Sequence, residues 1–121
     1  MIDDRALLDT IPSFHSYARM LGQAPLAILV CGDVERELSP GYWVQDCSAA
    51  TQNLLLAARA VGLGAVWLGI HPREERVAGM RQLCGLPPTI MPLALIAIGD
   101  PAVDQARVDR YDETRVHRNR W

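Results

Sequence analysis

The sequence predicts a layered fold of alternating helices and strands in one domain. Three short apolar runs, at residues 26–31, 65–70 and 93–98, have the length and composition of buried strands. Segments whose apolar residues recur at helical spacing precede each of these runs. Because helices and strands alternate along the chain, the helices are expected to cover the strands in layers, as in an α/β architecture. A chain of 121 residues, half of them hydrophobic, is long enough for one such domain.

Residues 3–22 are expected to form two short helices, separated at Pro12 and Ser13. Apolar residues recur on one side of each helix: Leu7, Leu8 and Ile11 in the first, and Ala18, Met20 and Leu21 in the second. Gly22 is a typical helix stop. The run from Leu26 to Cys31 follows, and an unbroken apolar run of this length indicates a strand covered on both faces.

The segment from Tyr42 to Val61 is expected to form the longest helix. One apolar face holds Cys47, Ala50, Leu54, Ala57 and Val61, a second holds Ala49, Leu56 and Ala60, and a narrow polar stripe holds Ser48, Gln52 and Arg59. A helix that is apolar on nearly all sides is buried on more than one side, and in so short a chain a second subunit is the expected cover. We therefore expect a homodimer that packs partly through this helix, with a central helix inside one domain as the alternative.

The second half of the chain is expected to add two strands, one helix and an arm. Gly62 ends the long helix, and residues 65–70 form the next strand. Pro72 begins a further helix, which stops at Gly85 and has an inward side of Val77, Met80, Leu83 and Cys84. The strand at residues 93–98 ends at Gly99. Residues 102–121 lack helical or strand periodicity, so they are expected to form an extended arm.

Composition and cysteine spacing exclude several classes of protein. The net charge is −2, which offers no electrostatic reason to expect nucleic acid or an anionic membrane as a partner. No apolar run reaches the roughly 18 residues of a membrane span. The cysteines Cys31, Cys47 and Cys84 form no C-x-x-C pair and do not cluster with the histidines, so we expect neither a metal site nor a disulfide framework. Free cysteines of this kind are typical of a reducing compartment, so we expect a cytoplasmic location.

Glycine placement distinguishes between kinds of ligand site. A Rossmann site needs glycines between a strand and the helix after it, whereas Gly62 and Gly64 lie between a helix and the strand after it. The chain contains no lysine, which excludes a P-loop, and it has no G-x-S-x-G motif. A glycine-bounded strand from Gly62 to Gly69 can instead bring bare backbone N–H groups against a flat ligand such as a flavin ring.

Five segments resemble, in the right order, those of the FMN-dependent nitroreductase family. Residues 46–58 resemble the family's central helix, and residues 62–69 resemble the passage from that helix into the next strand. The other three are residues 24–30, which match an earlier strand, 95–101, which resemble the last core strand with its Gly-x-Pro exit, and 110–121, which resemble the C-terminal arm. The resemblance implies an α+β fold, a three-layer α-β-α nitroreductase-like sandwich in an intertwined dimer.

One departure from the family pattern concerns the start of the chain. Family members usually begin with a further segment that holds an arginine- and serine-rich phosphate motif and an Asn-x-Gln-Pro-Trp-like motif near the flavin, and neither occurs here. The chain therefore resembles the family's C-terminal portion. We expect residues 1–121 to be a single nitroreductase-like domain that is short at its N-terminus, with residues 102–121 as the arm.

The resemblance also implies a function, in which hydride passes from NAD(P)H through FMN to a nitroaromatic, quinone or similar small-molecule acceptor. No side chain is expected to be catalytic, because the flavin N5 carries the chemistry. The resemblance assigns cofactor binding to the backbone of Trp67, Leu68 and Gly69 at the N5 and O4 edge, and to Arg110 at the phosphate, with Arg107 as a second cation. The arm is expected to wrap onto the partner subunit, so that the dimer completes the site.

Two alternatives remain beside this hypothesis. The main alternative is a noncatalytic nitroreductase-like module that serves dimerisation or partner binding and no longer holds FMN. A Rossmann-like nucleotide-binding module is disfavoured by the glycine order. Without the resemblance, the sequence predicts that Trp67 is a core residue and that Gly69 ends a strand. Arg110 is then expected to be a charged residue of the arm that faces solvent.

Overall fold

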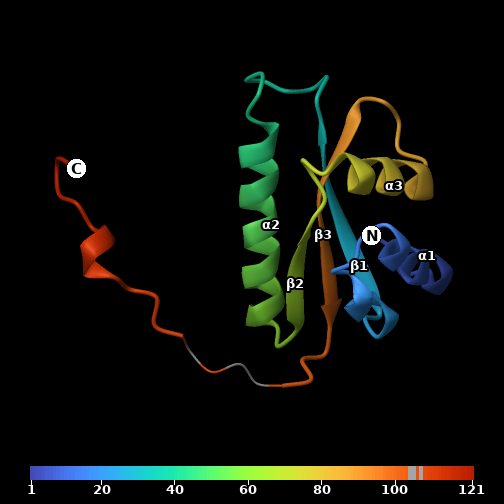
Figure 1. The fold of residues 1–121 in the computed structure, drawn as a ribbon, viewed down its shortest axis with the longest axis horizontal. Helices are drawn as coiled ribbons and strands as arrows, with labels where there is room; N and C mark the ends of the chain where they lie inside the picture. Colours follow the sequence, from blue (N-terminus) through green and yellow to red (C-terminus); the bar gives the residue numbers. More distant parts are fainter. Residues whose placement is uncertain (104–105, 107) are drawn as a thin grey trace.

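The computed structural model, which describes residues 1–103, 106 and 108–121, contains one three-stranded antiparallel sheet. The strands β1 (Leu26–Asp33) and β2 (Gly64–Gly69) both pair with the central strand β3 (Ile90–Gly99). Helices cover both faces of this sheet (Figure 1). The predicted α+β, three-layer α-β-α sandwich is thereby confirmed, whereas the intertwined dimer stays a prediction.

The helices are divided between the two faces of the sheet. Helix α2 (Trp43–Ala60) lies along one face, and α1 (Arg5–Thr10) and α3 (Glu74–Cys84) lie on the other (Figure 1). The Asp4 carboxylate begins α1 by accepting from two backbone N–H groups of its first turn. Gly85 ends α3 with a φ of 61°, a left-handed conformation that suits glycine.

Strand β3 is the centre of two hydrophobic cores. Its residues from Pro92 to Ile98 are all buried, because helices lie over both faces and a strand lies along each edge. Leu95 and Ala97 pack toward α1 and α3, whereas Ala94 and Ile96 pack toward α2. Because successive side chains of β3 point to opposite faces of the sheet, this one strand packs against both layers of helices.

The two other predicted strands are less buried than the sequence suggested. Strands β1 and β2 were expected to be covered throughout, but both lie at the edges of the sheet. In β2 only Leu68 is buried, and Val66 and Trp67 are 41% and 36% exposed. The burial of a strand depends on its place in the sheet. An apolar composition predicts a strand, but it does not predict which strand is central.

The buried side of α2 also differs from the predicted one. Its buried residues are Cys47, Thr51 and Ala58, whereas Ala57 and Val61 of the predicted inward face are exposed. A threonine is tolerated there because its hydroxyl donates to the Cys47 carbonyl oxygen at 2.8 Å. The inward face is thus displaced by one residue. The homodimer that packs partly through this helix stays a prediction.

The second N-terminal helix is replaced by short 3₁₀ turns at Ile11–Ser13 and Arg19–Gly22. Ala18 and Leu21 are buried as expected, but Met20 is exposed. Residues three apart lie on the same side of a 3₁₀ turn, which places Ala18 and Leu21 together and turns Met20 outward. In this outward position Met20 lines a cavity beside β2.

The C-terminal segment leaves β3 and extends away from the sandwich (Figure 1). Its described structure is local, with a 3₁₀ turn at Glu113–Arg115 whose start is capped by the Asp112 carboxylate. The assignment of residues 1–121 to one domain with an arm at 102–121 stays a prediction. Within the described part of the chain, no helix has both the length and the apolar character needed to cross a membrane.

The central strand supports a stability prediction. Leu95→Ala, at a position with 0% exposure, should lower the free energy of unfolding by about 2–5 kcal/mol, because it leaves a cavity between the layers. The same change at the fully exposed Leu38, Leu38→Ala, should change it by no more than about 0.5 kcal/mol. Urea unfolding of both variants measures the two values, and similar losses would contradict the central role of β3.

Candidate functional site

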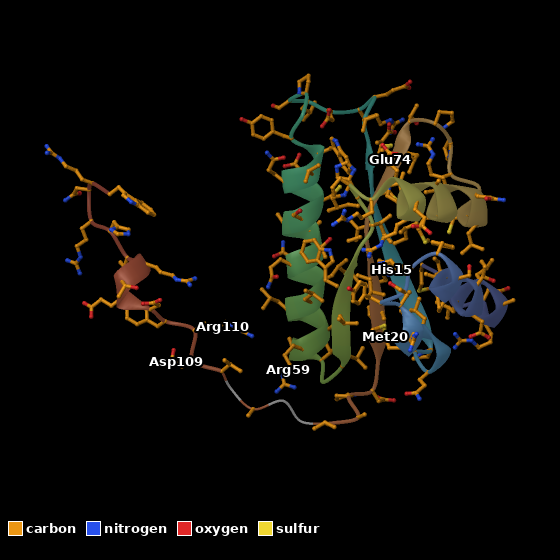
Figure 2. The ribbon with its side chains drawn as sticks, in the orientation of Figure 1. His15, Met20, Arg59, Glu74, Asp109 and Arg110 are labelled. Carbon is orange, nitrogen blue, oxygen red and sulfur yellow. The ribbon has the colours of Figure 1, made fainter. Side chains whose placement is uncertain are left out.

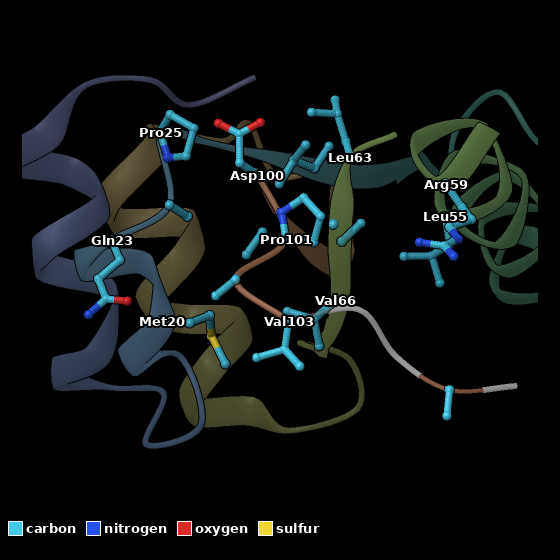
Figure 3. A pocket seen from close by; sticks show the side chains of 18 of the residues that line it. Met20, Gln23, Pro25, Leu55, Arg59, Leu63, Val66, Asp100, Pro101 and Val103 are labelled. Atoms are coloured by element: carbon cyan, nitrogen blue, oxygen red, sulfur yellow. The ribbon is translucent and has the colours of Figure 1, made fainter. Parts of the chain in front are cut away.

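A broad groove of about 1240 Å³ opens at the end of the sheet where β3 leaves the sandwich. Figure 3 shows Pro101 in its middle, with Leu55 and Arg59 of α2 to one side and Gln23 and Pro25 to the other. Most of the walls are apolar. The arm contributes Val103, Ala106, Val108 and Arg110.

Two cations face this groove from different segments. Arg59 lies in the last turn of α2, and Arg110 belongs to the arm (Figure 2). Asp100 is an acidic residue of the same lining. A guanidinium group that lines an apolar groove can hold an anionic group such as a phosphate.

A second, smaller cavity of about 370 Å³ lies along the edge of β2. It is lined by residues 66–69 of β2, by His15, Tyr17 and Met20 from the N-terminal turns, and by Arg76 from α3. Met20 and Val66 line both cavities, so the groove and the smaller cavity adjoin one another. We call the two together the β2-edge site.

The backbone of β2 presents free polar groups to this site. The Ile70 N–H donates to the Leu93 carbonyl, and in an antiparallel ladder every second residue repeats that pairing. Leu68 and Val66 therefore bond to β3, whereas Trp67 and Gly69 direct their N–H and C=O groups away from it. A β carbon added to Gly69 would meet nothing within 4 Å, so the face of the sheet at Gly69 is open.

The Gly69 carbonyl is held by two side chains. Arg76 Nη1 donates to it at 2.8 Å, and His15 Nε2 lies 3.1 Å from it. Since the carbonyl accepts, the proton of the neutral His15 ring is on Nε2. The Arg76 guanidinium also lies 5.7 Å above the centre of the Tyr17 ring. These contacts tie the edge of β2 to α3 and to the N-terminal turns.

His15 is a buried neutral base. It is 1% exposed. Its Nδ1 atom is also buried and has no hydrogen-bond partner among the described residues. Burial, and then the positive charge of Arg76, lower the pKa of His15 below its ordinary value of 6.5. A proton on Nδ1 would be a buried donor without an acceptor, so the structure favours the neutral ring.

The structure divides the predicted cofactor residues between the two cavities. Trp67, Leu68 and Gly69 line the smaller one, and Arg110 lines the groove. Leu68 differs from its neighbours, because its side chain is in the core and its backbone pairs with β3. Arg107 lies outside the described residues. The assignment of these residues to a cofactor stays a prediction.

The site also contains residues that sequence reasoning missed. Arg59 was assigned only to a polar stripe, and His15, Tyr17 and Arg76 were given no role. Each is distant in sequence from β2, and His15 lies 54 positions before the Gly69 carbonyl that it contacts. A histidine in a short apolar turn was the available signal, but it does not say which strand the ring would reach.

Other chemistries find little support in the described residues. No group of three or more metal-ligating side chains occurs there. The three cysteines carry no disulfide, and burial raises the pKa of the Cys31 thiol to about 11. A thiol with so high a pKa is a poor nucleophile at neutral pH. The site is therefore a backbone edge with cations around it.

Comparison with known proteins gives consistent results. Residues 9–100 match the sequence model of the Nitroreductase family. A protein of Methanothermobacter thermautotrophicus, provisionally named NADH dehydrogenase/NAD(P)H nitroreductase, is 46% identical over 121 residues, which are all of this chain and 63% of that protein. The chain thus spans less than two thirds of that curated relative.

Two solved structures have the same fold. The crystal structure of a Bacteroides thetaiotaomicron protein with the same provisional name is 46% identical, with a TM-score of 0.93 over 99% of this chain and 70% of that one. A provisionally named nitroreductase from Desulfovibrio desulfuricans, solved in complex with FMN, is 30% identical, with a TM-score of 0.79 over 100% of this chain and 70% of that one.

The state of His15 generates a pH prediction. Because the folded protein binds this proton less readily than the unfolded chain, the free energy of unfolding should fall as the pH drops from 6.5 through the lower folded-state pKa. His15→Gln keeps an N–H donor for Gly69 and should flatten this slope, which for one proton is at most about 1.4 kcal/mol per pH unit. Urea unfolding between pH 5 and 8 measures it.

His117→Gln provides the control, because His117 is exposed on the arm. That variant should keep the slope of the wild type. An identical slope in His15→Gln and the wild type would show that His15 does not titrate in this way.

Proposed function

Because this chain belongs to the nitroreductase family, we propose that it is the FMN-holding part of an oxidoreductase that takes hydride from NAD(P)H. The acceptor would be a nitroaromatic, a quinone or a similar small molecule. The relatives' names and the FMN in the Desulfovibrio desulfuricans structure support this proposal. The chain spans 63% of its relative from Methanothermobacter, so the activity itself is part of the proposal.

The free backbone edge of β2 is the observation that carries the proposal. The register directs the N–H groups of Trp67 and Gly69 away from β3, on the strand edge that lines the smaller cavity, and a β carbon added to Gly69 would meet nothing within 4 Å. A flat ring with acceptor atoms along one side can approach such an edge closely. In this proposal the flavin carries the chemistry, and the protein supplies binding and orientation.

The chain's own residues would bind and orient the cofactor. When bound, FMN supplies the hydride acceptor and donor atom, N5. The N–H groups of Trp67 and Gly69 would face the ring edge, and the apolar walls of the β2-edge site would exclude water from it. Arg110 and Arg59 would hold the phosphate at the groove.

We further propose that the protein acts as a homodimer. The outward face of α2 carries apolar residues that its own chain leaves exposed, among them Leu56 at 60% and Val61 just beyond the helix at 72%. A row of small and apolar residues on a helix that is covered on one side suits a second subunit. The arm, which extends past this face of α2 (Figure 1), would then reach the partner.

The same surface favours a second candidate function, a noncatalytic module for dimerisation or partner binding. Exposed apolar residues on α2 serve that function without any cofactor. The two candidates differ in one property, the saturable uptake of FMN. That measurement therefore decides between them.

FMN titration, followed by quenching of flavin fluorescence, tests the proposal. The wild type should take up FMN with saturation. Gly69→Val should weaken the uptake at least about tenfold, because its side chain fills the open space on the face of the sheet next to the N–H edge, and it should leave the urea midpoint unchanged or higher. No saturable uptake by the wild type would overturn the proposal, and equal uptake by both proteins would exclude the Gly69 edge as the contact.

Comparison of FMN with riboflavin tests the phosphate contact. Arg110→Ala should weaken FMN by roughly 10- to 150-fold, the effect of losing a hydrogen bond to a charged group. Riboflavin, which lacks the phosphate, should bind both proteins alike. Arg118→Ala, a matched change farther along the arm, should change neither affinity, and equal losses of FMN and riboflavin in Arg110→Ala would exclude the phosphate contact.

A further inference from the structure

The Gly69 carbonyl has two donors, but only one of them brings a charge. His15 stays neutral, because its proton is on Nε2 and its buried Nδ1 has no acceptor beside it. Arg76 is the cationic donor, at 2.8 Å. A carbonyl oxygen has two lone pairs and accepts both bonds, and the two donors differ in charge.

The position of Arg76 relative to the free edge follows from covalent geometry. The Gly69 oxygen and the Gly69 amide nitrogen belong to one residue, and both point away from β3. Given the 2.8 Å bond to the oxygen, Arg76 Nη1 lies within about 6 Å of that amide nitrogen. A ligand that accepts from this amide would lie one hydrogen bond farther from the Arg76 charge, a distance at which a unit charge still acts on it.

The peptide that follows Gly69 is fixed from both sides. Its carbonyl is held by Arg76 and His15, and its N–H, which belongs to Ile70, donates to the Leu93 carbonyl at 3.0 Å. The His71 N–H donates to the same Leu93 oxygen at 3.0 Å. The end of β2 is therefore anchored to α3, to the N-terminal turns and to β3 at a single peptide unit.

We propose that Arg76 is a positioning residue of the β2 edge, which with neutral His15 fixes the Gly69 carbonyl and whose charge favours the reduced state of a flavin bound at Trp67 and Gly69. This inference rests on the proposed function. Arg76 does not touch the ring in this proposal, but acts through the Gly69 peptide and through its charge. Reduction adds electron density to the ring, so a nearby cation stabilises the reduced form more than the oxidised form.

The first measurement needs no cofactor. Amide hydrogen exchange of Ile70 and His71 reports how firmly the Gly69 peptide is held, since both N–H groups bond to Leu93. Arg76→Met removes the donor and keeps an apolar stem, and should speed exchange at both amides about tenfold relative to the wild type. Arg73→Met, an exposed arginine at the start of the same helix, should leave both rates unchanged. Wild-type rates in Arg76→Met would overturn the positioning role.

The second measurement concerns the redox state of the flavin. Each protein is titrated with oxidised FMN and, without oxygen, with chemically reduced FMN. The ratio of the two dissociation constants, oxidised over reduced, should fall about tenfold in Arg76→Met and stay unchanged in Arg73→Met. Arg76→Lys should recover most of the ratio, because it restores the charge with a single donor group.

The outcomes separate this inference from the proposed function. If the wild type binds neither form of FMN, both proposals are overturned. If the wild type binds FMN and the ratio is the same in Arg76→Met, the proposed function stands and the charge effect is overturned. A fall in the ratio that Arg76→Lys restores supports the charge of Arg76 as its cause.

Discussion

The burial of β3 on both faces and both edges is the constraint on which the rest of the structure depends. Because β3 takes the middle of the sheet, β1 and β2 become edge strands, and each keeps one side free of backbone pairing. The register of β2 against β3 then decides which of its residues face outward, and these are Trp67 and Gly69. A one-residue slip would turn Leu68 outward instead and close the site.

The elements could largely be predicted from the sequence, and their places in the sheet could not. The strands, the long helix and the glycine stops all follow local rules, and the observed bounds differ by only a few residues. The choice of β3 as the central strand depends on contacts between segments that are far apart, so the apolar runs at β1 and β2 were wrongly expected to be buried. The same limit explains α2, where the hydrogen bond of Thr51 to Cys47 made a polar residue acceptable on the inward face.

The candidate site shows the same division. The backbone edge at Trp67 and Gly69 could be inferred from glycine spacing together with the family resemblance. The side chains that hold it, His15 and Arg76, come from segments whose sequence carries no motif for that contact. Arg107 is not described by the structure, and Arg110 shares its groove with Arg59, which only the fold brings near. Sequence patterns thus identify where the backbone is free, and the folded chain determines which charges surround it.

The open edge of β2 also bears on the solubility of the protein. Unpaired strand edges are templates on which another chain can extend the sheet, and they are a common starting point for aggregation. An incoming strand would have to bond to the Gly69 carbonyl, but Arg76 and His15 already occupy that acceptor. The pair of side chains therefore opposes sheet extension at the Gly69 end of β2, the end that lines the cavity.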